Sequence, residues 1–310
     1  MAQTKAIVDK LLSNVSSGYQ ATGLIADQIF PEVKSVQKTG KLGKHGTAHL
    51  RIERSVTGGR GEYRRVETTA RTTDTYSVES HGLEGLVTED DYDNVEQPFE
   101  AEQDETLGLT SVITIEKEKI FADSLFSTSI ITQNVTLAGT EKYTNKLDSD
   151  PINDFQTARA TIYDGCGLPP NHAIMPWKVW NILRFHPAML DVLGFKDNRP
   201  GGLNESELAS ALGVEKLLIS SGMYESAKEG QASALAPIWS SDILFYVRPS
   251  GPAKMQVSLG YQVKLTSRPG KRVLKYSVNN PPNSTGIIVD DSYDLFLSNV
   301  KSAYLIKGAI

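Results

Sequence analysis

The residues that could carry out covalent chemistry are few. The single cysteine, Cys166, stands six residues before His172, and such a pair could supply a thiol nucleophile and its base. A Gly-Leu-Pro-Pro turn separates the two, and no third group that could orient the histidine lies nearby in the sequence. We therefore expect Cys166 to be an inert packing residue, and we assign no catalytic residue to this chain.

Metal binding is not favoured either. His45 and His49 could share one face of a strand, with His81 further along, but zinc needs three or four closely placed ligands. His45 and His49 also lie in a basic segment that would repel a cation. Asp150, directly before Pro151, is better interpreted as the N-cap of a helix than as a calcium ligand.

A phosphate-binding loop is not supported by the glycines at positions 40, 43 and 46, since no Gly-Lys-Ser/Thr follows and no strand precedes them. We interpret these glycines as flexible points in an extended arm. No cofactor is expected.

The strongest compositional feature is a pair of adjacent, oppositely charged blocks. Residues 34–71 contain ten basic and three acidic side chains, a local charge of +7, whereas residues 72–116 contain thirteen acids and no lysine or arginine. Each block would repel itself, but blocks facing each other in neighbouring copies would attract. Two solvated faces, or a DNA-binding arm, are alternatives; the second is less favoured because the acidic block follows at once. The predicted inter-subunit contact residues are Arg51, Arg54, Arg60, Arg64, Arg65, Glu89, Asp90, Asp91 and Asp93.

The elements that must position these charges begin with a short amphipathic helix at 5–15, ended by Gly18. Alternating residues at 49–53 and 62–67 predict two strands, joined through a glycine-rich turn at 57–61. Such a hairpin has little to bury against its own chain, and an isolated hairpin is marginal in water. We therefore expect other subunits to hold it.

A long helix is predicted at 97–126, about 45 Å in length. The chain then changes to an α/β pattern in which apolar segments are short and strand-sized. Further helices are predicted at 151–163, 177–185, 187–193 and 205–212, and strands at 173–175, 216–219, 243–247, 256–259, 262–265, 273–278, 286–289 and 302–306. We expect the two tryptophans of the second of these helices, Trp177 and Trp180, to pack against the α/β core.

Composition limits the class of protein. With 310 residues, 39% hydrophobic and 22% charged, the chain can bury a substantial core. Its apolar runs are too short to span a bilayer, so no membrane association is expected. One cysteine allows no internal disulfide, which fits synthesis in a cytosol. A net charge of −5 argues against the whole chain acting as a nucleic-acid-binding protein.

The order of the elements resembles the major capsid proteins of tailed bacteriophages, the fold often called Hong Kong 97. The most telling segment is 171–191, with a short strand, Pro176, a helix carrying both tryptophans, and then His186-Pro187. The likeness continues through 208–220 and on to Trp239. It implies an α+β fold with an N-terminal arm at 1–45, an extended loop at 46–82, a peripheral domain with a long spine helix at 83–150 and 255–310, and an α/β axial domain at 151–254.

The resemblance also implies a function. Such proteins self-assemble into pentamers and hexamers of an icosahedral or prolate shell that encloses double-stranded DNA, and they are not enzymes. The implied partners are other copies of the chain, a separate scaffolding protein, a portal, a possible decoration protein and packaged DNA contacted non-specifically. The implied location is the virion, after synthesis and assembly in the bacterial cytoplasm.

Two departures from the family affect the expected mechanism. Some relatives carry a large N-terminal scaffolding extension that is cleaved; here only about 30 residues precede the basic arm, so we expect no proteolytic maturation. Some relatives cross-link through a lysine on the extended loop. Here the predicted tip carries Arg60, whose guanidinium stays protonated, so we expect non-covalent contacts.

Two alternatives remain. The first is a nanocompartment shell of the same fold, an encapsulin-like protein, which holds enzymes instead of DNA. The second is a soluble α/β enzyme, which would need a catalytic constellation that the sequence does not contain.

Overall fold

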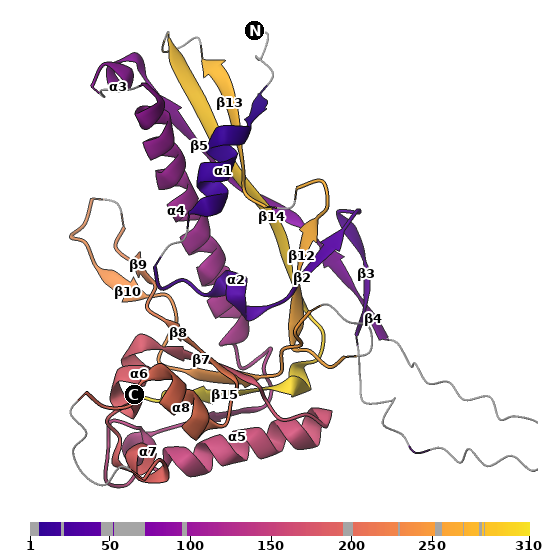
Figure 1. The fold of residues 1–310 in the computed structure, drawn as a ribbon, viewed down its shortest axis with the longest axis vertical. Coiled ribbons are helices and arrows are strands. Elements are labelled where there is room, and N and C mark those ends of the chain that lie inside the picture. Colours follow the sequence, from indigo (N-terminus) through magenta and orange to yellow (C-terminus); the bar gives the residue numbers. More distant parts are fainter. Residues whose placement is uncertain are drawn as a thin grey trace, which may run out of the picture.

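The structure, a computed structural model, is elongated and has two halves joined by one long helix (Figure 1). It describes residues 6–19, 22–44, 52, 72–94, 98–194, 201–228, 230–251, 256–268, 270–278, 281 and 283–310.

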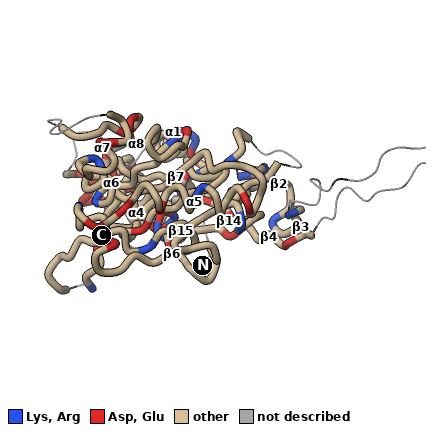
Figure 2. The backbone as a smooth tube through the Cα atoms, turned by 90° about the horizontal axis from the view of Figure 1, so that it is seen from below, with Lys and Arg blue, Asp and Glu red and all other residues tan. Residues whose placement is uncertain are grey.

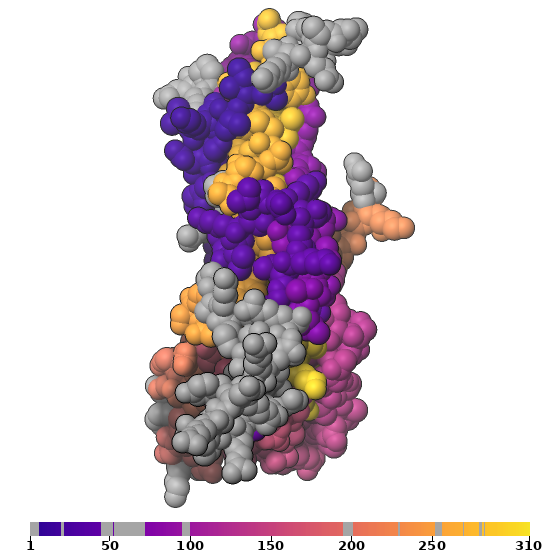
Figure 3. Space-filling model, turned by 90° about the vertical axis from the view of Figure 1, so that its right-hand side faces the viewer, coloured from indigo at the N-terminus to yellow at the C-terminus, as the bar shows by residue number. Residues whose placement is uncertain are grey.

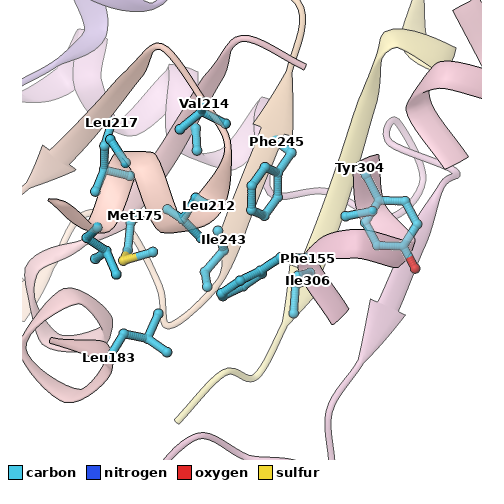
Figure 4. Close-up of a cluster of buried hydrophobic side chains, with 14 of the residues drawn as sticks. Phe155, Met175, Leu183, Leu212, Val214, Leu217, Ile243, Phe245, Tyr304 and Ile306 are labelled. Atoms are coloured by element: carbon cyan, nitrogen blue, oxygen red, sulfur yellow. The ribbon is translucent and has the colours of Figure 1, made fainter. Parts of the chain in front are cut away.

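The lower half is a five-stranded sheet covered on both faces. Its strand order is β6 (Asn134–Thr136), β15 (Ala303–Lys307), β11 (Ile243–Tyr246), β7 (His172–Pro176) and β8 (Lys216–Ser220). One face packs against α5 (Pro151–Cys166), α6 (Trp177–Leu183), α7 (Pro187–Val192) and α8 (Glu205–Leu212). Figure 4 shows this core, in which Phe245 from the sheet packs near Phe155 from α5, and Met175 lies on the side of Leu183 from α6. The alternate residues Ile174 and Leu244 face the opposite side. Burial on both faces explains why these strands are continuous apolar runs.

The upper half is a larger sheet with two helices on it. The strand order is β1 (Ile7–Asp9), β13 (Arg272–Val278), β14 (Ser284–Leu297), β12 (Gly260–Leu265) and β2 (Glu32–Ser35), while β5 (Glu79–Val87) also pairs with β14. The helices are α1 (Lys10–Gly18) and α4 (Pro98–Leu125). Leu12 and Ile113 from these helices pack on Val273, Ile287 and Val289 of the sheet. The C-terminal end of α4, with Phe121 and Leu125, instead packs in the core on the second face of the lower sheet, the face opposite α5–α8. One helix therefore belongs to both halves.

The remaining elements are short. They are α2 (Ala26–Ile29), β3 (Thr39–Lys44), β4 (Thr72–Ser77), α3 (Glu89–Asp93), β9 (Met223–Glu225), β10 (Leu235–Pro237) and the 3-10 turns Gly139–Glu141 and Val300–Ser302. The strands β3 and β4 form one antiparallel pair, and β9 and β10 form another.

Helix boundaries agree closely with the predictions where local capping residues are present. The side chain of Asp150 accepts a hydrogen bond from the Asn153 N–H, which confirms it as the N-cap of α5. The helix predicted at 205–212 has these bounds, since Asn204 caps its start and Gly213 adopts the left-handed conformation at its end. The long helix differs from its predicted range by one residue at each end.

Several boundaries were predicted wrongly, among them the strand predicted at 286–289, which extends over Ser284–Leu297. The N-terminal helix begins at Lys10, not at residue 5, because the Asp9 carboxylate accepts the N–H groups of Leu11 and Leu12 and starts the helix there. Residues 7–9 form β1 instead. The segment predicted as a strand at 256–259 is irregular, although Leu259 is fully buried, and the strand begins at Gly260. Burial alone produced that apolar pattern.

Sheet membership differs from the predicted domain ranges at two strands. The strands β6 and β15 lie in ranges predicted as peripheral, yet β15 pairs with β11 and β6 pairs with β15 in the lower sheet. Such pairing between distant segments leaves no local signal. The predicted hairpin strands at 49–53 and 62–67 lie outside the described residues, apart from the exposed Ile52.

One stability prediction follows from the long helix. Gly108 is exposed in α4, and a Cβ added there would meet no heavy atom within 4 Å. We expect Gly108→Ala to raise the free energy of unfolding by about 0.5–1 kcal/mol in urea titrations, because alanine restricts the unfolded chain. Gly213→Ala is the control with the opposite sign, since its φ is +66° and its Cβ would lie 2.5 Å from Arg159 Nη1. A less stable Gly108→Ala protein would contradict this interpretation.

Candidate subunit interface

The predicted extended loop has a well-defined base. The β3–β4 ladder runs from the pair Thr39 and Ser77 to the pair Lys44 and Thr72, so the base starts earlier in the chain than the predicted residue 46. Lys44 forms an ion pair with Asp74 at 2.6 Å. The hydrogen bonds from Lys44 and from the Thr75 N–H lower the pKa of Asp74.

An apolar cluster holds this base on the upper sheet. Tyr76 is buried among Val263, Phe296 and their neighbours, and its hydroxyl lies 2.6 Å from the Ser35 hydroxyl. Gly40 stands opposite Tyr76 in the ladder, where a Cβ would approach the phenol oxygen to 2.5 Å. The ring therefore fits only because residue 40 is glycine. Figure 2 shows β3 and β4 at one extremity of the molecule, so residues 45–71 join two strands that are anchored at that edge.

The predicted acidic contact residues lie together on α3, at the other end of the upper half (Figure 1). All four, Glu89, Asp90, Asp91 and Asp93, are exposed. Asp91 completes a capping box by accepting the Thr88 N–H and hydroxyl, and these bonds lower its pKa.

Glu89 accepts a hydrogen bond from the Asn283 amide at 3.0 Å. Among the residues that the structure describes, no lysine or arginine forms an ion pair with any of these four carboxylates. Glu102, further along the acidic block, is instead paired with Lys275 inside the fold. The acidic block thus contains at least one internally paired carboxylate, Glu102, and an exposed group on α3 that no described cation pairs with.

The predicted contact between the two charge sets involves residues that the structure does not describe. The five arginines of the basic set, at positions 51, 54, 60, 64 and 65, lie outside the described residues. Their contact with α3 stays a prediction. The described part of the molecule shows only that the acids are exposed and that the base of the basic segment is anchored at a separate edge.

An apolar surface on the lower half was not predicted from the sequence. Trp177 is 49% exposed and borders a cavity of about 490 Å³ that is also lined by Met223, Trp239 and Ile310. The expectation that Trp177 packs in the core was wrong, whereas Trp180 does pack against the core cluster. The buried side of α6 carries Val179 and Leu183, and Trp177 lies roughly 200° around the helix from Val179. This position around the helix is the sequence feature that indicates an exposed Trp177.

Two more surfaces have features typical of contacts between molecules. The β9–β10 hairpin protrudes from the body (Figure 3) and exposes 67% of Leu235. In the upper half, Ile7, Val8 and Leu11 are exposed on β1 and α1. Contiguous exposed apolar groups mark binding surfaces more often than isolated ones.

The groups considered for catalysis are buried and neutral. Burial raises the pKa of the Cys166 thiol, which makes it a weak nucleophile. Burial, with the positive charges of Arg248 and Lys216, lowers the pKa of His172 to about 4. In the described ranges no three histidine, cysteine or acidic side chains are grouped as metal ligands. None of the helices described has the length and apolarity needed to cross a membrane.

Comparisons with known proteins agree with this architecture. No protein-family model matches the chain. It is 24% identical over 246 residues to the major capsid protein of Burkholderia phage BcepMu, covering 78% of this chain and 77% of that protein. Its structure is similar to that of a phage-related protein from Bordetella bronchiseptica RB50, with a TM-score of 0.75, 21% identity and 98% of each chain covered. The capsid structure of cyanophage P-SCSP1u gives a TM-score of 0.59 at 9% identity, over 94% of this chain and 91% of that chain.

These likenesses extend over both halves of the molecule and confirm the α+β fold of Hong Kong 97 type predicted from the sequence. The resemblance to phage major capsid proteins is confirmed as well.

Proposed function

We propose that this chain is a major capsid protein of a tailed bacteriophage, a subunit of the closed shell around a double-stranded DNA genome. The observation that carries the proposal is a fold shared along almost the whole chain with a viral capsid structure, together with a curated relative that is a phage major capsid protein. The same likeness supports assembly into multimers. We propose pentamers and hexamers, with the virion as the location and the host cytoplasm as the place of synthesis and assembly.

The mechanism of assembly follows from the separation of the charges. The basic residues 45–71 follow and precede the two strands of the anchored β3–β4 base in the chain, and α3 carries exposed carboxylates that no described cation pairs with. Each exposed ion pair contributes only about 0–1 kcal/mol. Many such contacts, repeated over a closed shell, give a durable container because each later contact forms within an already assembled structure.

The proposed role is structural, with no catalytic step and no cofactor. A separate scaffolding protein, a portal, a possible decoration protein and non-specific contact with packaged DNA complete the proposed set of partners. A shell that holds protein cargo is the alternative, and the phage origin of the relatives favours DNA.

A charge-swap experiment tests the assembly mechanism. We expect Arg60→Glu with Arg64→Glu to abolish shells in negative-stain electron microscopy and sedimentation while the monomer stays folded by circular dichroism. Asp90→Arg with Asp93→Arg should do the same from the acidic side. Combining all four changes should restore part of the assembly, because the attraction is re-formed with its signs exchanged.

Normal shells from either double variant would contradict the proposed contact. Raising the salt concentration should also loosen parent shells, since the screening length falls from about 10 Å at 0.1 M to about 3 Å at 1 M and weakens exposed ion pairs. If the parent protein forms no rings or shells even with scaffolding protein supplied, the capsid function itself is wrong.

A further inference from the structure

Residues 22–35, here called the strap, cross the junction between the two halves of the molecule. Figure 1 shows the strap passing over α4, through α2, before it ends as β2 beside β12. Its first part lies against the lower half, where the Gly23 carbonyl accepts the N–H groups of Ser221 and Gly222 at 3.1 Å each. Its last part belongs to the upper sheet. The strap is therefore placed where it can hold one half against the other.

One buried carboxylate joins the strap to the long helix and to the lower half. Glu118 projects from α4 and is fully buried. Its Oε1 accepts hydrogen bonds from the Ile25 N–H at 2.9 Å and from the Trp239 Nε1–H at 2.6 Å. Its Oε2 accepts the Ala26 N–H at 2.7 Å. Ile25 and Ala26 belong to the strap, while Trp239 lies in the connection that leads into β11 of the lower sheet.

Neighbouring contacts reinforce this point of attachment. Lys117, the residue before Glu118, pairs with Asp27 of the strap and lies 3.5 Å from Asp291 of β14. The Tyr246 hydroxyl of β11 donates to the Ile29 carbonyl at 3.3 Å. The strap thus contacts the long helix, the upper sheet and the lower sheet within a few residues.

The three N–H donors around Glu118 require two acceptor oxygens, which a carboxylate provides. Burial raises the pKa of Glu118, and its hydrogen bonds with Ile25, Trp239 and Ala26 oppose that effect. No described lysine or arginine forms an ion pair with it. A buried charge without a cation is costly, and a neutral amide of the same shape would avoid that cost. A glutamine, however, offers one acceptor oxygen, so its NH₂ group would face the N–H of either the strap or Trp239.

We propose that Glu118 is a latch that fastens the strap to the long helix and to the lower sheet together, so that strap docking sets the angle between the two halves. This inference rests on the proposed capsid function, because in a shell the angle between the halves of each subunit sets the curvature. Glu118 acts here as a positioning residue.

The test uses Glu118→Gln with Glu116→Gln as its matched control. Glu116 lies two residues away on the same helix, and its side chain is 52% exposed and 4.0 Å from His81. We expect Glu118→Gln to speed amide hydrogen exchange by about tenfold or more, the effect of losing a hydrogen bond to a charged group. The affected peptides are those covering 22–35 if the NH₂ group faces the strap, and those around 235–242 if it faces Trp239. Glu116→Gln should leave exchange in these peptides unchanged. Unchanged exchange in both sets of peptides in Glu118→Gln would overturn the latch.

A second variant separates the two sides of the latch. Trp239→Phe removes the donor from the lower half, together with part of a buried ring, so exchange should rise in peptides around 235–242 while Ile25 and Ala26 keep their bonds to Glu118. It also serves as the test if Glu118→Gln fails to fold. If exchange in the strap rose as much as exchange around 235–242 in Trp239→Phe, the contacts of Glu118 with the strap and with Trp239 would not be separate.

Particle size tests the link to curvature. Shells assembled from Glu118→Gln should show a broader spread of diameters in electron microscopy than shells from the parent or from Glu116→Gln. A parent-like spread, with a loosened strap, would overturn the role in setting the angle. If no variant and no parent protein assembles, the capsid function fails while hydrogen exchange still decides whether Glu118 is a latch.

Discussion

Replacing Lys117 with alanine is expected to lower the free energy of unfolding by about 3–5 kcal/mol, the effect of breaking a buried ion pair. The side chain of Lys117 is 1% exposed and lies between Asp27 and Asp291, the second of which is itself 2% exposed. Its ammonium group also lies 4.8 Å from the centre of the Tyr293 ring. Alanine would remove this cation, leave the Asp291 carboxylate buried without its partner, and open a space inside the fold.

Lys119→Ala provides the matched control for urea titrations of the Lys117 variant. Lys119 lies one position beyond Glu118 on α4 and pairs with Asp123, but its side chain is 38% exposed. An exposed pair at this spacing on a helix contributes only about 0.3–0.5 kcal/mol. Similar losses from both substitutions would show that the buried cluster around Lys117 does not stabilise the fold as argued here.

Replacing Phe245 with alanine is expected to be similarly damaging, at about 3–5 kcal/mol. Phe245 is fully buried in the central part of the lower sheet, with its ring 5.5 Å from the ring of Phe155 (Figure 4). Helices α5–α8 and the sheet are closely packed and cannot collapse fully into the space left behind. The loss of folding free energy therefore combines the transfer of a large apolar side chain with the cost of a cavity.

Phe185→Ala is the comparison of the same chemical type. Phe185 follows α6 and is 39% exposed, so its truncation should change the free energy of unfolding by about 1 kcal/mol or less. Thermal unfolding followed by circular dichroism would compare the two. If the exposed Phe185 proved as important as Phe245, the assignment of the lower core would be wrong.

Local residues explain why several elements were predicted accurately. The bounds of α8 follow from Asn204 at its start and Gly213 at its end, and α5 starts at the residue after Asp150. Capping acts within one helical turn, so the sequence around each end carries the whole signal. The start of the N-terminal helix was predicted wrongly because of the same kind of local signal. Its cap, Asp9, was not recognised, and β1 exists only because β13 lies beside it.

The candidate interface was predictable only in part. The acids on α3 are exposed as a polar run of four carboxylates suggests. Trp177 was misplaced because its aromatic character outweighed its position on the helix. The contact between the acidic and basic residues stays a prediction, since it would form between copies of the chain.

By itself, the sequence determined the periodic and capped elements, the two opposed charge blocks and the resemblance to capsid proteins, because each depends on residue types at short spacing. Only the tertiary structure decided which charges are internal. In the sequence, Lys117, Glu118 and Lys119 look like one charged turn of a helix. The fold buries the first two and exposes the third, because segments around residues 25 and 239 pack over one side of α4. Burial depends on partners more than 90 positions away, and no local pattern records them.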